Sequence, residues 1–221
     1  MAENCVLYYI TDRRQFSADE SKNRRHLLAK ICEAASAGVD YIQLREKDLS
    51  ARDLEKLALE ARRAIIIGWT ANPKSTTRLL INSRTDVALA SRANGVHLRS
   101  HDISPREVRD ISSKAEDNAH PDIRPLFVIA VSCHTPAEVN QAAENAANFA
   151  VFAPVFEKQG ATPAGLDQLR VACRARIPVL ALGGVTLENA ESCLQAGAAG
   201  IAGIRLFQDK NIAEVVHRLR H

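Results

Sequence analysis

The stretch YIQLREKDLSARD, residues 41–53, contains a complete passage from a β-strand to an α-helix. Its first five residues predict a strand in which Gln43 and Arg45 share one face, while the apolar residues between them face the other way. Ser50, followed three residues later by Asp53, is a weak capping box and predicts the start of a helix. Apolar residues then recur at helical spacing, at Leu54, Leu57, Ala58, Ala61 and Ile65. This stretch therefore predicts one βα unit.

The same unit recurs along the whole chain. Capping boxes with proline at the first helical position start two more helices, at Ser104–Glu107 and Thr135–Glu138. Thr186 is predicted to cap another helix, and Ile212–Leu219 is predicted to form the last. The predicted strands are Val6–Thr11, Tyr41–Arg45, Leu79–Asn82, Gly95–Leu98, Leu126–Ser132, Phe149–Ala153, Pro178–Leu182 and Gly200–Ile204.

Eight strand–helix units within 221 residues predict an α/β protein with a parallel (β/α)8 TIM barrel, a single domain spanning residues 1–221. The alternative is an open doubly wound sheet. That fold usually carries a glycine-rich phosphate turn after its first strand, and Thr11–Arg14 has no GxGxxG pattern. Two longer stretches, Ile67–Arg78 and Ser112–Pro125, are predicted surface excursions between units.

Composition narrows the function classes. Hydrophobic residues make up 46% of the chain, and the net charge is only +3, so neither nucleic acid nor a membrane surface is an expected partner. We see no apolar run of spanning length and no signal peptide, and we expect a cytoplasmic protein. The five cysteines are scattered and are predicted to be reduced, mostly buried side chains.

In a TIM barrel the functional groups lie where the strands end and the βα loops begin. After the second predicted strand, Gln43 and Arg45 are expected to point into the barrel near its mouth, where an anionic substrate would pair with the guanidinium. An internal ion pair of Arg45 with Glu46 or Asp48 explains the same pattern equally well.

The ends of the next strands carry further polar residues. His97 alternates with apolar neighbours, which favours a hydrogen-bonded residue of the barrel interior over a zinc ligand. Ser132 and His134 share one strand face and are candidates to contact a substrate. Cys133 and His134 are adjacent and point apart, so they do not form a nucleophilic dyad.

Glycines follow the seventh predicted strand at Gly183 and Gly184, and Ile204 and Arg205 follow the eighth. Barrels commonly bind phosphate at this place through backbone N–H groups, and glycine lets an oxyanion approach closely. A tight turn into the next helix would use the same glycines. Together with Arg45, these residues suggest two separated anion sites and two phosphorylated substrates.

Several motifs in this order resemble the thiamine phosphate synthase family and the related thiazole tautomerases. The likeness covers nearly the whole chain, and the segment around Arg45 is its most specific part. The matching segments are LYYITDR at 7–13, YIQLREKD at 41–48, LINSRTDVALA at 80–90, GVHL at 95–98, VSCHT at 131–135, APVF at 153–156 and LGGV at 182–185.

The resemblance implies a condensation of 4-amino-2-methyl-5-hydroxymethylpyrimidine diphosphate with a thiazole phosphate, which gives thiamine phosphate and pyrophosphate. Gln43, Arg45 and Lys47 would hold the pyrimidine diphosphate. Asn82 would contact the same substrate, and Ser132 would contact the pyrimidine or the pyrophosphate.

The resemblance also implies Mg²⁺ as cofactor, with Asp102 as its ligand. Gly183 and Gly184, with the backbone at Ile204 and Arg205, would bind the thiazole phosphate. The same resemblance makes a homodimer plausible.

Three positions depart from the family pattern. Ser83 stands where a second magnesium-binding aspartate is usual, and Arg205 stands where serine is usual. Lys158 is the candidate for the lysine of a threonine-rich loop that this chain lacks. The alternatives are a thiazole tautomerase, with His134 as general acid–base, and a non-catalytic binder of thiamine precursors.

Overall fold

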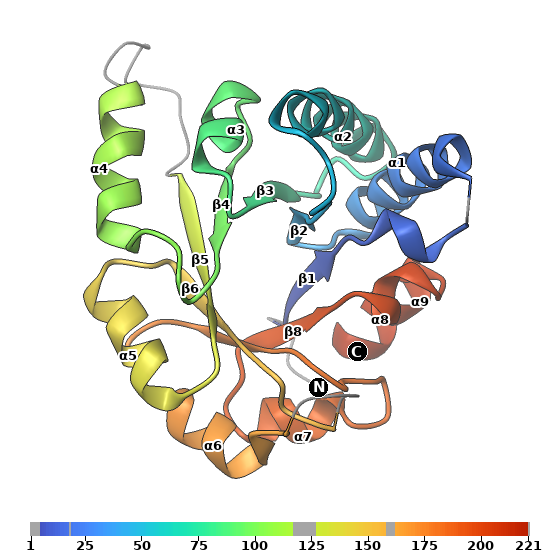
Figure 1. The fold of residues 1–221 in the computed structure, drawn as a ribbon. Coiled ribbons are helices and arrows are strands. Elements are labelled where there is room, and N and C mark those ends of the chain that lie inside the picture. The colour runs from blue at the N-terminus through green and yellow to red at the C-terminus, as the bar shows by residue number, and fades with distance from the viewer. Residues whose placement is uncertain (1–4, 18, 117–126, 158–161, 221) are drawn as a thin grey trace.

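The computed structural model describes residues 5–17, 19–116, 127–157 and 162–220. Its strands close into one parallel barrel in chain order, β1 to β8, as the prediction required (Figure 1). All eight predicted strands are present within one or two residues of their expected ends. They are β1 Val6–Ile10, β2 Tyr41–Leu44, β3 Arg78–Asn82, β4 Gly95–Leu98, β5 Val128–Cys133, β6 Phe149–Phe152, β7 Val179–Ala181 and β8 Gly200–Gly203.

Helices form a ring around the barrel, and at least one helix follows each strand (Figure 1). A short 3-10 helix, η1 (Arg13–Gln15), follows β1 before the first α-helix. The α-helices are α1 Glu20–Ala37, α2 Ala51–Ala71, α3 Thr85–Ala90, α4 Pro105–Glu116, α5 Pro136–Glu144, α6 Gly165–Ala172, α7 Ala190–Gln195, α8 Arg205–Gln208 and α9 Ile212–Arg220.

Both predicted surface excursions are partly wrong, because helices extend into them. Helix α2 continues to Ala71 because its packed face continues: Gly68 is buried, and a Cβ there would lie 2.5 Å from Ala35 Cβ on α1. Helix α4 runs to Glu116, and Ser112 on it is buried. Residues 117–126 lie outside the described part of the chain.

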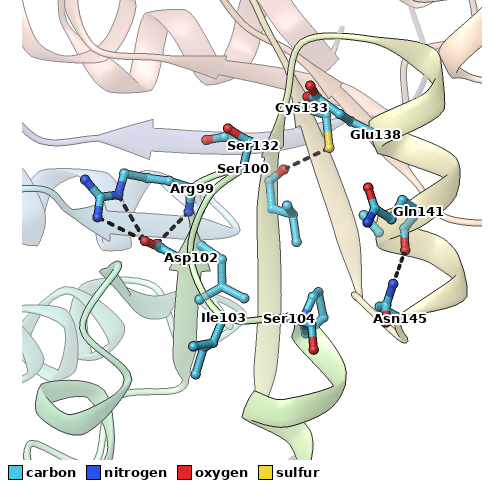
Figure 2. Close-up of a pocket in the computed structure, with 14 residues that line it drawn as sticks. Arg99, Ser100, Asp102, Ile103, Ser104, Ser132, Cys133, Glu138, Gln141 and Asn145 are labelled. Atoms are coloured by element: carbon cyan, nitrogen blue, oxygen red, sulfur yellow. Dashed lines mark hydrogen bonds and ion pairs between the residues drawn. The ribbon is translucent and has the colours of Figure 1, made fainter.

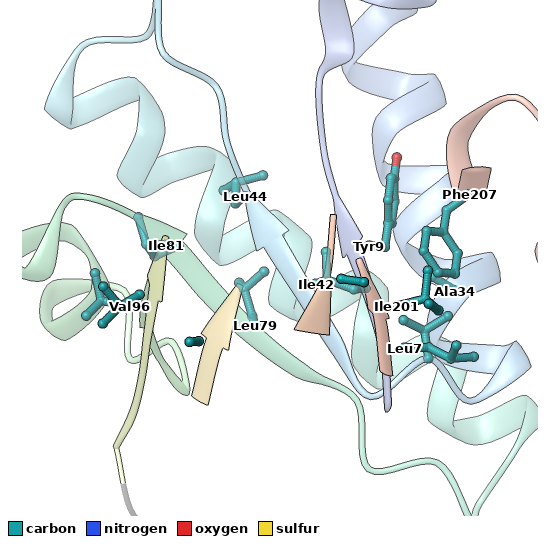
Figure 3. Packing of buried hydrophobic residues seen from close by; sticks show 14 of the residues in the cluster. Leu7, Tyr9, Ala34, Ile42, Leu44, Leu79, Ile81, Val96, Ile201 and Phe207 are labelled. Atoms are coloured by element: carbon teal, nitrogen blue, oxygen red, sulfur yellow. The ribbon is translucent and has the colours of Figure 1, made fainter. Parts of the chain in front are cut away.

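Hydrophobic residues pack in two layers separated by the sheet. Strand alternation sends Tyr8 and Ile10 into the barrel interior, where they meet Leu80, Phe149 and other inward residues. The outward residues of the strands, such as Leu7, Tyr9 and Ile42, pack with helix residues such as Ala34 and Phe207 (Figure 3). The interior of the barrel is therefore filled with side chains, and a ligand must bind at its mouth.

The capping predictions for α4 and α5 are confirmed. Glu107 N donates to Ser104 Oγ at 3.3 Å, and Ser104 N donates to the Glu107 carboxylate at 2.8 Å. Glu138 N donates to Thr135 Oγ1 at 3.2 Å. The prediction for Thr186 is wrong: α7 begins at Ala190, and the Thr186 hydroxyl accepts from the N–H of Glu188 within a preceding turn.

No helix in the described ranges combines the length and apolar character needed to cross a lipid bilayer.

Candidate active site at the barrel mouth

A chain of contacts crosses the ends of β2 and β3. Gln43 points into the barrel, and its Nε2 donates to Asn82 Oδ1 at 2.8 Å. Asn82 Nδ2 in turn donates to Ser83 Oγ at 3.3 Å. Gln43 is almost fully buried, so its amide is held in one orientation by this bond. The sequence placed these three residues at strand ends, and the structure brings them into direct contact.

Asp102 continues this chain from the loop after β4. Burial alone would raise the pKa of its carboxyl, but hydrogen bonds from the Arg99 backbone and side chain and from the Ser83 hydroxyl outweigh burial and lower the pKa. Arg99 N lies 2.8 Å and Arg99 Nη2 lies 3.0 Å from the Asp102 carboxylate (Figure 2). Asp102 is therefore an anion beside Ser83. Sequence reasoning did not identify Arg99, although a basic residue three positions before an acid is a common local pair.

These residues meet the minimum for Mg²⁺. The ion is commonly held in proteins by one or two carboxylates together with phosphate oxygens of the substrate. Asp102 supplies one carboxylate, and Ser83 supplies a neutral hydroxyl next to it. Among the described residues, no group of three or more acidic, histidine or cysteine side chains is arranged to hold a metal.

The segment after β2 is held by a buried ion-pair network. Arg13, from the β1 loop, is 2% exposed, and its Nη1 lies 3.0 Å from Glu46 and its Nη2 2.8 Å from Asp48. The Glu46 carboxylate also accepts from Thr11 Oγ1 at 2.5 Å and from Arg13 N. Thr11 Oγ1 accepts from Arg45 N at 3.0 Å, which joins the loops after β1 and β2.

This network corrects the ion-pair alternative for Arg45. Glu46 and Asp48 do form ion pairs, but with Arg13 from the loop after β1. None of the ion pairs found in the described ranges involves Arg45. Its guanidinium instead lies near enough to His97 to disfavour a second positive charge there. Lys47 is exposed on the same segment.

His97 is a hydrogen-bonded residue of the barrel interior, as the favoured alternative predicted. Its Nδ1 lies 2.8 Å from the Tyr8 hydroxyl and its Nε2 lies 2.7 Å from Ser132 Oγ. Burial and the nearby Arg45 lower the pKa of His97 to about 3, against a small opposite effect of Asp102. The ring is therefore neutral at physiological pH, and it links the barrel interior to Ser132.

The end of β5 carries the two other candidates. His134 is exposed, and its Nδ1 lies 2.7 Å from the carbonyl oxygen of Ala153, so Nδ1 carries a proton and Nε2 is the nitrogen that can exchange one. Cys133 between them is fully buried. Burial, and to a lesser extent the Glu138 charge, raise the pKa of its thiol to about 12. Cys133 is thus a packing residue rather than a nucleophile.

A cavity of about 130 Å³ opens between the β4–α4 loop and α5 (Figure 2). Asp102 and Ser132 both line it, and Gln141 of α5 and Asn145 directly after that helix add amide groups. Sequence reasoning missed these two residues, because a polar side chain on a helix surface or at a helix end carries no signal that it lines a cavity. The cavity shows that Asp102 and Ser132 face a common space.

The two glycines after β7 are required by packing. Gly183 and Gly184 have φ of +94° and +66°, where most L-residues are strained. A Cβ on Gly183 would lie 2.7 Å from Pro154 Cα, and one on Gly184 would lie 2.8 Å from Phe156 Cβ. The loop after β6 therefore lies directly against the turn. A phosphate role for these glycines comes in addition to this steric one.

The remaining predicted residues are Ile204, Arg205 and Lys158. Ile204 directly follows β8 and precedes α8, whose first residue, Arg205, is exposed. This places Arg205 at the same end of the barrel as Arg45. Lys158 lies outside the described residues.

Known proteins resemble this chain along most of its length. The family model described as thiamine monophosphate synthase matches residues 7–207. The chain is 33% identical over 207 residues to the thiamine-phosphate synthase of Roseiflexus castenholzii, covering 90% of this chain and 79% of that protein. It is 31% identical over 220 residues to the thiamine-phosphate synthase of Alkaliphilus oremlandii, covering 97% and 93%.

A solved structure is also similar. The thiamine phosphate pyrophosphorylase of Pyrococcus furiosus superposes with a TM-score of 0.77 at 26% identity, covering 99% of this chain and 95% of that one. The family match extends from β1 to α8 and thus includes every strand end described above. This chain is therefore a member of the thiamine monophosphate synthase family.

Proposed function

We propose that this protein condenses 4-amino-2-methyl-5-hydroxymethylpyrimidine diphosphate with a thiazole phosphate to form thiamine phosphate and release pyrophosphate. The observation that carries the proposal is the continuous set of contacts from Gln43 through Asn82 and Ser83 to Asp102. It aligns amide, hydroxyl and carboxylate groups along one rim of the barrel. Such a set suits a substrate with both a heteroaromatic ring and a metal-binding diphosphate.

The pyrimidine diphosphate would lie along this rim. Gln43 and Asn82 would orient it through their side-chain amides, because each retains further hydrogen-bonding capacity beyond their mutual bond. Arg45 and Lys47 would hold the diphosphate through charge-assisted hydrogen bonds. Ser132 would donate to the pyrimidine or to the departing pyrophosphate, and the resemblance adds Lys158 as a further cation for the diphosphate.

Asp102 would hold Mg²⁺ together with the diphosphate, with the Ser83 hydroxyl beside it. The bound ion would neutralise charge on the leaving pyrophosphate, which is where charge develops during the reaction. On the opposite side, the backbone at Gly183, Gly184, Ile204 and Arg205 would bind the thiazole phosphate. The family resemblance supports these roles, and a protein nucleophile is not needed for them.

The experiment is an assay of thiamine phosphate formation from the two purified precursors at millimolar Mg²⁺. The Arg45→Met variant should lose roughly 10- to 100-fold in kcat/KM, the effect of one hydrogen bond to a charged group. Arg63→Met removes an exposed arginine of α2 and matches the change in charge, so it should retain full activity. No product from the native chain, beside an active control synthase, would reject the proposal.

A second candidate is a thiazole tautomerase, favoured by one observation at His134. Its Nδ1 donates to the Ala153 carbonyl, which leaves Nε2 to accept or release a proton at the barrel mouth. Isomerisation of thiazole carboxylate phosphate without Mg²⁺, lost in His134→Ala, would establish this activity. Tight binding of thiazole phosphate without turnover of any precursor would instead indicate a non-catalytic binder.

A further inference from the structure

A hydrogen-bonded chain of three side chains runs from the barrel interior to its mouth. Tyr8 comes from β1, His97 from β4 and Ser132 from β5, so the structure brings together residues from three distant parts of the sequence. Tyr8 Oη lies 2.8 Å from His97 Nδ1, and His97 Nε2 lies 2.7 Å from Ser132 Oγ. Tyr8 is fully buried and His97 is 2% exposed, whereas Ser132 is half-buried and lines the cavity.

The surroundings of Tyr8 determine the direction of the first hydrogen bond. Its ring stacks on His97 at 5.7 Å between centroids and meets the edges of Tyr41 at 6.0 Å and Phe149 at 5.6 Å. Within the described ranges, His97 Nδ1 is the sole hydrogen-bond partner of the Tyr8 hydroxyl. A buried O–H without an acceptor is costly, so Tyr8 donates its proton to Nδ1.

The protonation state of His97 determines the donor in the second hydrogen bond, between His97 and Ser132. A neutral imidazole has a single N–H, so a ring that accepts at Nδ1 must carry its proton on Nε2. Burial and the Arg45 charge lower the pKa of His97 to about 3, and the Asp102 charge opposes them only weakly. The ring is therefore neutral near pH 7. Nε2–H therefore donates to Ser132 Oγ. The hydroxyl of Ser132 then retains its own proton for another acceptor.

We propose that Tyr8 is a positioning residue that fixes the Nε2–H tautomer of His97 and thereby commits the Ser132 hydroxyl to donate to a ligand at the barrel mouth. The ligand group would be an acceptor such as a phosphate oxygen. Only the binding of this ligand group rests on the proposed function, because the donor–acceptor direction of the Tyr8–His97–Ser132 hydrogen bonds is a property of the protein alone.

The first test needs no ligand. Protein labelled with ¹⁵N-histidine is studied at pH 7 by long-range ¹H–¹⁵N correlation, and the signals of His97 are assigned by their loss in His97→Asn. The expected spectrum shows a protonated Nε2 and an unprotonated Nδ1 that accepts a hydrogen bond. A proton on Nδ1 would overturn the proposal, because Ser132 would then donate to the ring.

Conservative variants test each hydrogen bond of the chain. Tyr8→Phe keeps the buried ring, so the fold is retained, and it should move the Nδ1 resonance of His97 toward that of a free acceptor. Tyr41→Phe removes a hydroxyl from the neighbouring ring of the same cluster and should leave that resonance in place. An Nδ1 signal unmoved by Tyr8→Phe would also overturn the proposal.

The consequence for ligand binding is measured with inorganic pyrophosphate and Mg²⁺ by calorimetry. Ser132→Ala should weaken binding roughly 10-fold, and Tyr8→Phe should weaken it less. Because both act through one hydroxyl, the double variant should bind no worse than Ser132→Ala, and additive losses would contradict the proposal. If the native protein does not bind pyrophosphate, the proposed function fails. The ¹⁵N spectra still decide the donor–acceptor direction of the Tyr8–His97–Ser132 hydrogen bonds.

Discussion

Replacing Arg13 by methionine should destabilise the protein more than any surface substitution. Methionine fills similar space but removes the cation that faces Glu46 at 3.0 Å. The Glu46 side chain is only 1% exposed, so its carboxylate would remain buried without a counter-charge. Removing one partner of a buried ion pair typically lowers the free energy of unfolding by about 3–5 kcal/mol. The exposed Glu20 and Asp48 can regain water and should contribute little to this loss.

Urea unfolding followed by circular dichroism measures this effect. Arg24→Met is the matched control, because Arg24 forms a two-point pair with Glu60 at 2.9 Å, yet both side chains are more than one-third exposed. That variant should lose only about 0.2–1 kcal/mol.

A second substitution separates lost charge from lost packing. Glu46→Gln in the Arg13→Met background removes the buried charge and should restore about 1–3 kcal/mol relative to Arg13→Met alone. The reasoning would be refuted if Arg13→Met lost no more free energy than Arg24→Met. It would be refuted equally if the double variant were less stable than Arg13→Met, because the buried charge would then not be the cause.

Three further predictions concern other parts of the site. The pKa of His97 is about 3 in the folded protein and about 6.5 in the unfolded chain, so the unfolded chain takes up this proton first. The stability should therefore fall as the pH drops from about 6.5 toward 3. In this pH window, His97→Asn should reduce the slope of the unfolding free energy against pH by up to about 1.4 kcal/mol per pH unit. A slope equal to that of the native protein would contradict the prediction. Gly183→Ala should lower Tm by more than Gly165→Ala. Both glycines have positive φ, but only at Gly183 would the added Cβ lie close to another residue, Pro154. Equal shifts of Tm in thermal melts would contradict this prediction. Ser83→Asp should tighten Mg²⁺ binding beside Asp102, since Ser83 has φ +58°, which aspartate tolerates, and an unchanged metal titration would show that the side chain does not face the site.

The barrel could be predicted because each unit carries its own local evidence. Strand alternation placed Gln43 at the mouth, and the capping box at Ser104 gave the start of α4 to within a residue. Helix ends were harder. Helix α2 continues to Ala71 because Gly68 fits against α1, and that close approach depends on a second helix which a single segment cannot reveal.

The hydrogen-bond and ion-pair partners of the site residues could not be predicted from the sequence either. Glu46 and Asp48 were candidates to pair with Arg45, their neighbour in sequence, yet both pair with Arg13 from another strand end. The Tyr8–His97–Ser132 chain joins three strands, and its members look like ordinary barrel residues in isolation. Strand order predicts which ends meet, but the choice among several polar side chains is decided by packing.

The close packing of the glycine turn after β7 against the loop after β6 has a thermodynamic consequence. Val155 N donates to Leu182 O at 2.9 Å, and Phe156 N donates to Gly183 O at 3.0 Å, so the two loops are bonded as well as in steric contact. Neither loop can be displaced without the other. A ligand that orders one of them therefore pays part of the entropic cost of ordering the second, and two ligands bound on these loops would favour each other's binding.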